Sequence, residues 1–365
     1  MKITAAVAYG KSQPFKIEEL ELDEPREDEV IVRIVSAGVC HTDLSVRDGF
    51  FPTPLPAVLG HEGAGVVERV GSRVTKVQPG DHVIISFIGC GECLNCRRGR
   101  IGYCTSLSDL NFAAVRPDGS VCLHKDGEPI HGPFFSQSSF ATHALSFESG
   151  LIKVSKDVPL EILGPLGCGV MTGAGAVINA FKPSAGSSIA IFGTGSVGLS
   201  AIMAARIVGC TTIIGVDVRP QRLALAQELG ATHVINGSEG NTLEQIRDLT
   251  GGGVDYSLEA TGIPRILRQA VECLRLTGTC GIVGAPPLDT EVLLDVHSLI
   301  WGRTVRGIIM GDARPDIFIP QLIEFYKQGR LPFDKLIKNY RLEDINTAAA
   351  DSAAGAVLKP VLVFS

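Results

Sequence analysis

The stretch Gly193-Thr194-Gly195-Ser196-Val197-Gly198 decides the fold of the second half of this chain. It follows a short apolar run of strand type at residues 189–192 and opens an apolar segment of helical type at 197–208. Asp217 follows 19 residues after Gly198, at the end of the next apolar run. In this strand–turn–helix context, the spacing G-x-G-x-x-G is typical of a turn that binds the pyrophosphate of a dinucleotide.

Each position of this turn has its own physical role. Gly193 permits the tight turn, Gly195 lets the backbone approach the pyrophosphate, and Gly198 lets the helix pack closely on the strand. Ser196 directly precedes, and Val197 begins, the helix whose N-terminal N–H groups would face the phosphates.

Asp217 indicates which dinucleotide is bound. Its carboxylate would accept hydrogen bonds from the adenosine ribose hydroxyls and would repel a 2′-phosphate, which favours NAD over NADP. Arg219 and Arg222 lie nearby in the sequence and weaken this preference.

The region from residue 171 onward alternates strand and helix patterns. Strand candidates lie at 189–192, 212–216, 233–235, 254–258, 279–283 and 304–310, and helical patterns at 221–229 and 265–274 separate some of them. This alternation predicts parallel βαβ units, and six strands complete a doubly wound Rossmann sheet. The fold class expected for the chain is therefore α/β.

The first part of the chain has a different pattern of apolar and turn residues. Short β-branched runs at 30–35 and 83–85 are bounded by turn residues, which predicts a β-rich domain. Residues 118–140 show little periodicity and predict a long surface loop. We expect a catalytic domain at 1–170, a dinucleotide-binding domain at 171–309, and a C-terminal segment at 310–365 that returns to the first domain with a helix at 317–327 and a strand at 361–364.

Composition limits the class of protein. The chain has 365 residues, of which 45% are hydrophobic and 20% charged, and its net charge is −6. This balance disfavours nucleic acid or an anionic membrane as the main partner. The N-terminus lacks the apolar core of a signal peptide, no apolar run reaches the length of about 18 residues needed for a membrane span, and we expect a cytoplasmic protein. Its ten cysteines are then better explained as metal ligands or buried thiols than as disulfides.

Four of the cysteines form a local cluster with the spacing C-x2-C-x2-C-x7-C. They are Cys90, Cys93, Cys96 and Cys104. Four thiols so close in sequence predict a closed tetrahedral zinc site of structural type. An iron–sulfur cluster, which also uses four cysteines, is the alternative.

A second candidate set is spread along the chain. The stretch Gly60-His61-Glu62-Gly63-Ala64-Gly65 places a histidine 21 residues after Cys40 and well before the isolated Cys168. Two thiolates and one imidazole are a ligand set for a zinc ion that keeps one position open for chemistry.

Taken together, these motifs resemble those of zinc-dependent medium-chain alcohol dehydrogenases, and the resemblance covers essentially the whole chain. It includes Gly60-His61-Glu62-x2-Gly65-x5-Gly71-x2-Val74, the four-cysteine spacing, Gly167-Cys168-Gly169 and the dinucleotide turn, in that order. The resemblance implies that the first domain is GroES-like. The segments 311–320 and 332–336 look like the aryl-alcohol (benzyl-alcohol) dehydrogenase branch.

The resemblance also implies roles for residues around the catalytic zinc. Thr42 would hydrogen-bond the substrate oxygen and relay its proton, Asp43 would orient the His61 ring, and Glu62 would lie behind the zinc. Many relatives carry a histidine five residues after the first zinc cysteine to end the proton relay, whereas this chain has Ser45. The implied ligands of the catalytic zinc are Cys40, His61 and Cys168.

Further positions would contact the cofactor or the substrate. His41 and Lys359 would face the pyrophosphate, and Thr172 would touch the nicotinamide ring. The other implied cofactor contacts are Arg222, Val283, Ile308 and Met310. The implied substrate pocket is apolar and is lined by Phe51, Phe87, Phe140, Ala285 and Ile309, together with Met310. Such a pocket prefers an uncharged primary alcohol, aromatic or allylic, which would be oxidised to its aldehyde with NAD.

Two other functions fit the same motifs. A glutathione-dependent formaldehyde dehydrogenase would need a basic residue over the pocket, and Arg116 is the one suggestive candidate. A non-catalytic dinucleotide-binding protein of this fold would not need a complete zinc ligand set. The resemblance further implies a homodimer or homotetramer, in which the strand at 304–310 could pair across a two-fold axis.

Overall fold

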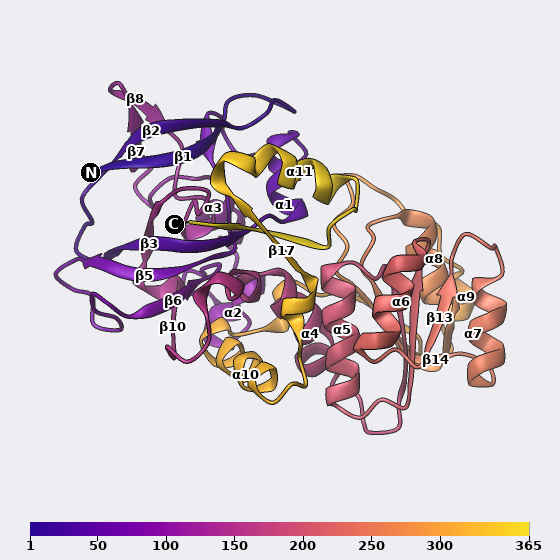
Figure 1. The fold of residues 1–365 in the computed structure, drawn as a ribbon. Helices are drawn as coiled ribbons and strands as arrows, with labels where there is room; N and C mark the ends of the chain where they lie inside the picture. Colours follow the sequence, from indigo (N-terminus) through magenta and orange to yellow (C-terminus); the bar gives the residue numbers. More distant parts are fainter. Residues whose placement is uncertain (365) are drawn as a thin grey trace. The chain divides into compact units, whose positions relative to one another are not determined.

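A computed structural model describes residues 1–364, which divide into two compact units (Figure 1). The second unit comprises Gly169–Ala313 and Leu322–Phe333, and the first comprises the rest. The sequence placed all of 310–365 with the first domain, whereas Leu322–Phe333 groups with the second unit. One contact that ties it there is the Arg330 guanidinium, which donates to the carbonyl of Ile207 at 3.1 Å.

The second unit contains a six-stranded sheet in the order β13-β12-β11-β14-β15-β16, and every neighbouring pair is parallel. Strand order reverses between β11 and β14, which makes their carboxyl ends the topological switch point of the sheet. The strands are β11 (Ser188–Phe192), β12 (Thr212–Asp217), β13 (His233–Asn236), β14 (Val254–Glu259), β15 (Leu274–Ile282) and β16 (Thr304–Gly307).

The second unit also contains six helices among its described residues, of which α5, α6, α7 and α8 pack against the sheet (Figure 1). They are α4 (Gly169–Gly175), α5 (Ser196–Ile207), α6 (Pro220–Leu229), α7 (Thr242–Thr250), α8 (Pro264–Glu272) and α9 (Val296–Leu299). α10 (Pro315–Lys327) begins in the first unit and ends in the second. All five residues of β11 are buried, because helices of an α/β sheet cover both of its faces and leave no polar side to the strand.

Two predicted boundaries in this unit are wrong. The strand predicted at 304–310 ends at Gly307, because Met310 has φ +51° and Gly311 has φ +69°, which a strand cannot accommodate. The helix predicted to reach residue 274 ends at Glu272, and β15 already begins at Leu274.

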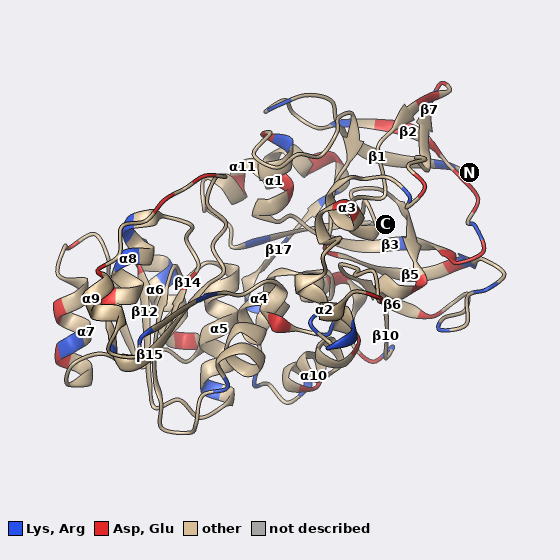
Figure 2. Ribbon diagram, turned by 180° about the vertical axis from the view of Figure 1, so that it is seen from behind, with Lys and Arg blue, Asp and Glu red and all other residues tan. Residues whose placement is uncertain are grey.

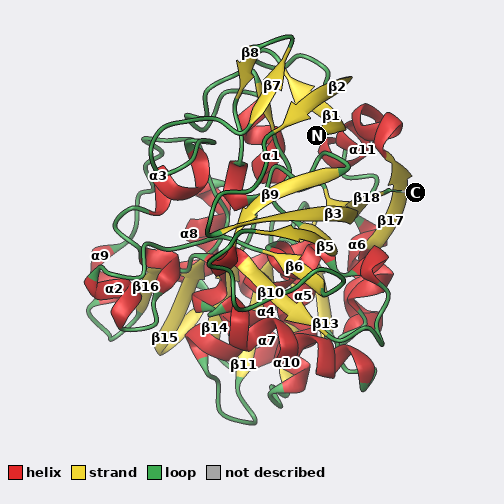
Figure 3. Ribbon diagram, turned by 90° about the vertical axis from the view of Figure 1, so that its left-hand side faces the viewer, coloured by secondary structure: helices red, strands yellow, loops and turns green. Residues whose placement is uncertain are grey.

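The first unit contains two sheets, whose strands are yellow in Figure 3. One has the order β4-β1-β2-β7-β8; the other has the order β10-β6-β5-β3-β18-β17, with β9 also paired to β3. The final strand β18 pairs antiparallel with β3, which returns the C-terminal segment to this unit. The strands are β1 (Lys2–Ala8), β2 (Lys16–Leu22), β3 (Glu29–Gly38), β4 (Ala57–Val58), β5 (Gly63–Val70), β6 (His82–Ile85), β7 (Leu123–Lys125), β8 (Glu128–Ile130), β9 (His143–Phe147), β10 (Leu151–Val154), β17 (Ile337–Arg341) and β18 (Lys359–Val363).

Four helices belong to this unit. They are α1 (His41–Arg47), α2 (Leu94–Arg97), α3 (Leu107–Phe112) and α11 (Ile345–Ala353). The long surface loop predicted at 118–140 is wrong in two respects. It contains the strands β7 and β8, and residues 134–140 are buried.

Acidic and basic residues are scattered over both units in Figure 2. Within residues 1–364, no helix is both long enough and apolar enough to cross a membrane.

Candidate active site and metal centres

The structure brings Cys40, His61 and Cys168 together, although they are far apart in the sequence. Their ligand atoms, with a carboxylate oxygen of Glu62, all lie within 4.8 Å of one another. Cys40 directly precedes α1, His61 lies just before β5, and Cys168 is the last residue before α4. His61 Nε2 is buried and has no hydrogen-bond partner in the described chain. A buried nitrogen without a partner, aimed at two thiols, is what a metal site requires of its histidine.

One buried carboxylate, Asp43, braces two of these three residues. Its Oδ1 lies 2.7 Å from His61 Nδ1 and accepts from the Gly60 N–H at 3.1 Å, and its Oδ2 accepts from the Cys40 N–H at 3.0 Å. Because Nδ1 is held by the carboxylate, Nε2 is the nitrogen left for a metal. The orienting partner of His61 that the resemblance implied is therefore present at hydrogen-bond distance.

The two thiols and the imidazole shift one another's pKa values. A hydrogen bond from Cys168 holds the pKa of Cys40 well below its usual value, and the same bond holds the pKa of Cys168 well above it. Burial alone would lower the pKa of His61, but Asp43 and Cys40 raise it well above the usual range. A metal ion would displace these protons, because thiolates and neutral imidazole are the ligating forms.

Lys359 and Glu62 form a buried ion pair beside this set. The Lys359 ammonium donates to both Glu62 oxygens at 2.9 Å, and both side chains are buried. Burial raises the pKa of Glu62 to about 7, although Lys359 acts in the opposite direction. The contact of Lys359 with the pyrophosphate stays a prediction; in the structure its ammonium is compensated by the Glu62 carboxylate, as a buried cation requires.

Residues 134–140 pack over the His61 stretch, and sequence reasoning missed this segment. Gln137 Oε1 accepts from the Gly63 N–H at 2.8 Å, and the Ser139 N–H donates to the Gly60 carbonyl at 2.9 Å. Phe135 adopts φ +49°, a strained value for a residue with a bulky side chain. Its ring lies 4.8 Å from the His61 ring.

Phe135 belongs to an aromatic cluster around His61. Phe112 lies 4.8 Å from Phe135 and 5.6 Å from Phe51, and Phe134 lies 6.0 Å from His61, all between ring centroids. The adjacent phenylalanines in an otherwise polar stretch, Pro133-Phe134-Phe135-Ser136, are the one signal in the sequence that could have indicated this cluster.

The five predicted pocket residues are divided between the two units. Phe51 belongs to the aromatic cluster. Phe87 and Phe140 are buried in the first unit, where the Phe140 ring packs against Phe15, and their place in the pocket stays a prediction. The other two lie in the second unit and are exposed, namely Ala285 and Ile309.

The four-cysteine cluster also assembles. The sulfur atoms of Cys90, Cys93, Cys96 and Cys104 lie within 4.8 Å of one another, and those of Cys90 and Cys96 are 4.0 Å apart. A tetrahedral zinc with Zn–S bonds of about 2.3 Å separates its sulfurs by about 3.8 Å, so one ion fits this set. An iron–sulfur cluster would separate some of the sulfurs more widely, because its four thiolates bind two or four different irons rather than one ion.

Backbone N–H groups point at these sulfurs as they do at thiolates. The N–H groups of Cys90, Cys93 and Cys96 donate to neighbouring cysteine sulfurs at 3.2 to 3.4 Å. Donation from the backbone of Cys96 and Thr105 lowers the pKa of Cys93 to about 5. The ten cysteines are all free, so no disulfide competes with metal binding at either set.

The dinucleotide turn has the geometry that its spacing predicts. A Cβ added at Gly198 would lie 1.9 Å from the Gly193 carbonyl oxygen, so helix and strand are in close contact there. At Gly195, by contrast, an added Cβ would meet nothing closer than Arg222 Nη1 at 3.9 Å, which leaves the backbone open to a ligand. Ser196 Oγ, at the N-terminus of α5, is buried and has no hydrogen-bond partner among the described residues. These features fit a bound pyrophosphate.

Asp217 is the last residue of β12, and its carboxylate connects the glycine turn to the turn between β12 and α6. Its Oδ2 accepts from the Thr194 N–H at 2.8 Å, and its Oδ1 accepts from the Val218 and Arg219 N–H groups at 2.8 and 3.0 Å. Arg222 Nη1 lies 3.9 Å from the carboxylate.

The remaining predicted cofactor residues lie in both units. In the second unit, the Thr172 hydroxyl approaches Met310 Sδ at 3.9 Å. Val283 and Ile308 follow the carboxyl ends of β15 and β16. In the first unit, His41 is exposed at the start of α1, and the Thr42 hydroxyl lies 4.0 Å from Cys40 Sγ.

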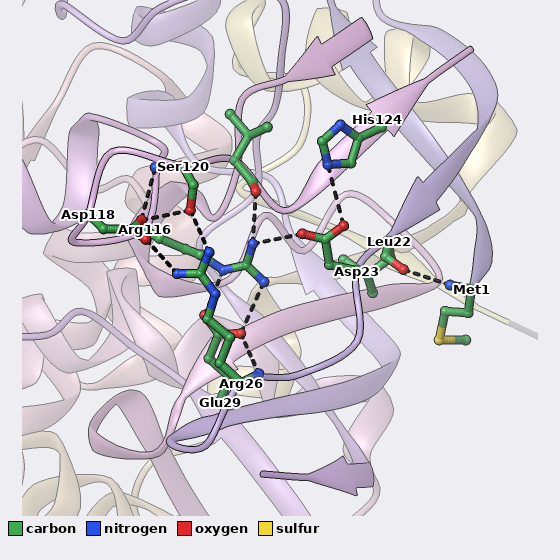
Figure 4. A network of polar contacts seen from close by, with 10 residues as sticks. Met1, Leu22, Asp23, Arg26, Glu29, Arg116, Asp118, Ser120 and His124 are labelled. Carbon is green, nitrogen blue, oxygen red and sulfur yellow. Dashed lines mark hydrogen bonds and ion pairs between the residues drawn. The ribbon is translucent and has the colours of Figure 1, made fainter. Parts of the chain in front are cut away.

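Arg116 is not a substrate-facing residue. Figure 4 shows its guanidinium inside a network of carboxylates. Nε donates to Glu29 at 2.7 Å, Nη1 donates to Asp23 at 2.7 Å, and the side chain is 2% exposed. This placement removes the residue that supported the glutathione-dependent alternative.

The fold and the two cysteine-containing sets define a dinucleotide-binding oxidoreductase with metal centres. The alcohol dehydrogenase GroES-like domain family matches residues 26–154, and the zinc-binding dehydrogenase family matches 196–328. The chain belongs to the zinc-dependent medium-chain alcohol dehydrogenases, and it is an alcohol dehydrogenase.

Several individual proteins are similar over the full length. Geraniol dehydrogenase of Castellaniella defragrans is 47% identical, with 99% of this chain and 97% of that protein covered. The structure of benzyl alcohol dehydrogenase from Acinetobacter calcoaceticus is also 47% identical, with a TM-score of 0.97 and all of both chains covered. An alcohol dehydrogenase zinc-binding domain protein from Burkholderia ambifaria is 55% identical, with a TM-score of 0.98 and 100% and 99% of the two chains covered.

Proposed function

We propose that this enzyme reversibly oxidises an aromatic primary alcohol such as benzyl alcohol to its aldehyde, with NAD as the hydride acceptor. The observation that carries this proposal is the convergence of Cys40, His61 and Cys168, with the unpartnered His61 Nε2, beside a cluster of phenylalanine rings. An apolar aromatic wall next to an open metal position favours an uncharged, ring-bearing alcohol over a charged one. The similarity to a benzyl alcohol dehydrogenase supports the same substrate class.

The residues of the first unit would supply the proton path and hold the metal. A zinc ion bound by Cys40, His61 and Cys168 would act as a Lewis acid on the alcohol oxygen, and NAD would accept the hydride. The Thr42 hydroxyl, adjacent to Cys40, would take the alcohol proton and pass it toward solvent. Ser45 replaces the histidine that ends this relay in many relatives, so the last transfer would go to water directly.

Asp43, Glu62 and Lys359 would act through the metal ligands. Asp43 would keep the His61 ring in the ligating tautomer and orientation. Glu62 lies next to the three ligands, and Lys359 neutralises its charge within the buried pair. The Cys90–Cys104 set would hold a second zinc, closed and structural, which pins a loop with little core of its own.

The cofactor would bind along the carboxyl edge of the parallel sheet. The pyrophosphate would lie over Gly193, Gly195 and the start of α5, and the adenosine ribose would meet Asp217. The Asp217 carboxylate disfavours a 2′-phosphate, so NAD should be preferred to NADP. The nicotinamide side would contact Thr172 in α4 together with Val283, Ile308 and Met310, which follow β15 and β16, while Arg222 would lie near the ribose.

Geraniol is a second candidate substrate, because a geraniol dehydrogenase is 47% identical over nearly the whole chain. Benzyl alcohol and an allylic alcohol share an sp² carbon next to the carbinol carbon. An apolar pocket separates such substrates by only about 1–3 kcal/mol per methylene-sized difference. We therefore expect activity with both and the higher kcat/KM with the aromatic one.

A substrate panel tests this proposal. Purified enzyme is assayed by NADH formation with benzyl alcohol, geraniol, ethanol and hydroxymethylglutathione, each with NAD and with NADP. The proposal expects benzyl alcohol with NAD to give the highest kcat/KM. A geraniol maximum would replace the aromatic substrate with the allylic one, and a hydroxymethylglutathione maximum would refute both. No turnover combined with a single zinc per chain would support the non-catalytic alternative.

We also propose a homodimer, or a tetramer built from such dimers. Among the described strands β16 pairs with β15 alone, so it is an edge strand of the sheet. Large exposed apolar side chains lie in the preceding segment, including Leu293, Val296, Ile300 and Trp301. Two copies of this edge can pair around a two-fold axis. Sedimentation velocity at micromolar concentration gives the mass, and a monomer would contradict the proposal.

A further inference from the structure

Glu259 is a buried carboxylate that none of the roles above uses. It is the last residue of β14 and is 1% exposed. In the register of the sheet it pairs with Phe192, the last residue of β11. β11 and β14 are the two strands between which the strand order reverses, so Glu259 lies at the switch point, where sheets of this type bind their ligands.

The side chain of Glu259 holds the turn that follows its own strand. Oε1 accepts hydrogen bonds from the Thr261 N–H at 2.6 Å and from the Gly262 N–H at 3.0 Å, and it also accepts from the Thr261 hydroxyl. That hydroxyl in turn accepts from the Ile263 N–H at 3.1 Å, directly before α8. Gly262 has φ +70°, so this turn depends on side-chain anchoring to keep its shape.

The backbone of the same segment joins the loops on either side. The Glu259 carbonyl accepts from the N–H groups of Val283 and Gly284 at 2.9 and 3.1 Å, after β15. The Ala260 N–H donates to the Phe192 carbonyl at 2.9 Å, directly before the glycine turn. Glu259 therefore lies between three neighbouring loops at the carboxyl edge of the sheet, namely those that follow β11, β14 and β15.

These three loops are in close van der Waals contact with one another. A Cβ added at Gly193 would lie 2.7 Å from Thr261 Cγ2. One added at Gly284 would lie 2.2 Å from the Gly262 nitrogen and 2.6 Å from Glu259 Oε2. A shift of the Thr261–Gly262 turn would therefore move both of its neighbours.

We propose that Glu259 is a positioning residue for the nicotinamide side of the dinucleotide, because it fixes the Thr261–Gly262 turn between the glycine turn and the loop after β15. This inference rests on the proposed NAD-linked function and adds a residue to its cofactor site. The adenine side would lie toward β12, where Asp217 ties the glycine turn to the start of α6 through a separate set of hydrogen bonds. Loss of the Glu259 anchor should therefore weaken binding of the nicotinamide half and spare the adenine half.

The test compares two ligands on the full-length enzyme. NADH affinity is measured by fluorescence titration and AMP affinity by calorimetry, for wild type, Glu259→Ala and Glu259→Gln. We expect the Kd for NADH to rise at least about tenfold in Glu259→Ala, the range set by losing hydrogen bonds to a charged group. The Kd for AMP should stay within about twofold, and the KM for NAD should rise more than kcat falls. Glu259→Gln keeps an oxygen acceptor and should recover most of the NADH affinity.

Control variants separate this role from a general effect on the unit. Glu244→Ala removes an exposed carboxylate from α7 and should leave both affinities unchanged. Thr261→Val keeps the shape of the side chain but removes the hydroxyl between Glu259 and α8. It should raise the NADH Kd by about threefold to tenfold, and it tests the anchor even if Glu259→Ala does not fold.

The results that overturn the inference are distinct from those that overturn the cofactor assignment. Unchanged NADH affinity in Glu259→Ala and Thr261→Val would refute the role of Glu259. So would a parallel loss of NADH and AMP affinity, which would indicate a general loss of structure. Failure of the wild-type chain to bind NADH would instead refute the proposed cofactor.

Discussion

The two candidate metal centres of the first unit are assembled in opposite ways. The four cysteines between Cys90 and Cys104 lie within one short segment, and nearby backbone N–H groups donate to their sulfurs. Cys40, His61 and Cys168 come from distant segments, and Asp43, Glu62 and Lys359 surround them from three parts of the chain. One centre would fold its own loop around an ion, whereas the other requires the finished fold before its ligands meet.

This difference indicates a division of labour. A local set of four ligands leaves no open position and stabilises a segment that lacks a core. A dispersed set of three ligands is held by buried partners, so its geometry is fixed before any metal or substrate arrives. Substitutions in the two centres should therefore affect different properties, stability in one case and turnover in the other.

The largest expected effect is on turnover, from Cys168→Ser. We expect kcat/KM for benzyl alcohol to fall by at least about 10³-fold, equivalent to about 4 kcal/mol, because the open metal position would be lost. Elemental analysis should show one zinc ion fewer per chain, with little change in Tm. Cys210→Ser, which changes a buried thiol outside both sets, is the matched control. Wild-type turnover in Cys168→Ser would contradict the assignment of turnover to this centre and of stability to the other.

The next effect is on stability, from Cys96→Ser. Structural zinc contributes about 10–16 kcal/mol to the folding of zinc-finger peptides, so we expect the free energy of unfolding to fall by at least about 3 kcal/mol here. Limited proteolysis should cut the loop between Cys90 and Cys104 first. Freshly purified variant should keep turnover within about tenfold of wild type, because the other ligand set is intact. A variant as stable as wild type, or one that loses turnover as completely as Cys168→Ser, would contradict the comparison.

A smaller effect on metal affinity is expected from Asp43→Asn. The side chain keeps its size but loses the charge that holds His61 Nδ1 and the Cys40 N–H. Loss of such a supporting group typically weakens metal binding by about 10–100-fold. Competition with a chelator measures this, and the four-cysteine centre of the same sample serves as an internal reference. Asp48→Asn, at the end of the same helix, should behave as wild type.

The smallest effect concerns the loop that follows the four-cysteine centre. Hydrogen bonds from the Ser120 hydroxyl and N–H, and from Arg26, hold the pKa of Asp118 below its usual range (Figure 4). A carboxyl with a lowered folded-state pKa stabilises the protein fully above its unfolded pKa of about 3.9, and this contribution disappears as pH falls through the lower folded value.

The corresponding measurement is the Tm of wild type and of Asp118→Asn between pH 7 and pH 3. Wild type should melt slightly higher at pH 7, and the difference should shrink below about pH 4 because the unfolded chain then takes up a proton at Asp118 before the folded chain does. Because the pair is exposed, added salt should reduce the difference as well. A difference that stays constant across this range would show that the carboxylate charge does not help to hold the loop.

Much of the fold could be predicted from local patterns. The turn at 193–198 and the alternation after it indicated a six-stranded parallel sheet, which the structure contains. Each of these patterns depends on neighbours within about 30 residues, so the periodicity and spacing of the sequence are enough to predict it. The four-cysteine centre is of the same kind.

Other features could not be predicted because their partners are distant. Burial of 134–140 depends on hydrogen bonds to Gly60 and Gly63, more than 70 positions away. Lys359 and Arg116 are basic residues that the sequence placed at ligands, but each is buried against carboxylates of the first unit. A buried cation needs a compensating anion, and only the folded chain decides which anion lies beside it.

By itself, then, the sequence determined the fold class, the dinucleotide turn and the residue types of both metal sets, because these depend on spacing along the chain. The tertiary structure decided that Asp43 braces both Cys40 and His61, that phenylalanine rings surround His61, and that Glu259 joins three loops at the switch point. These arrangements arise from burial, which pairs each polar group with whatever partner the packed chain brings within hydrogen-bond distance.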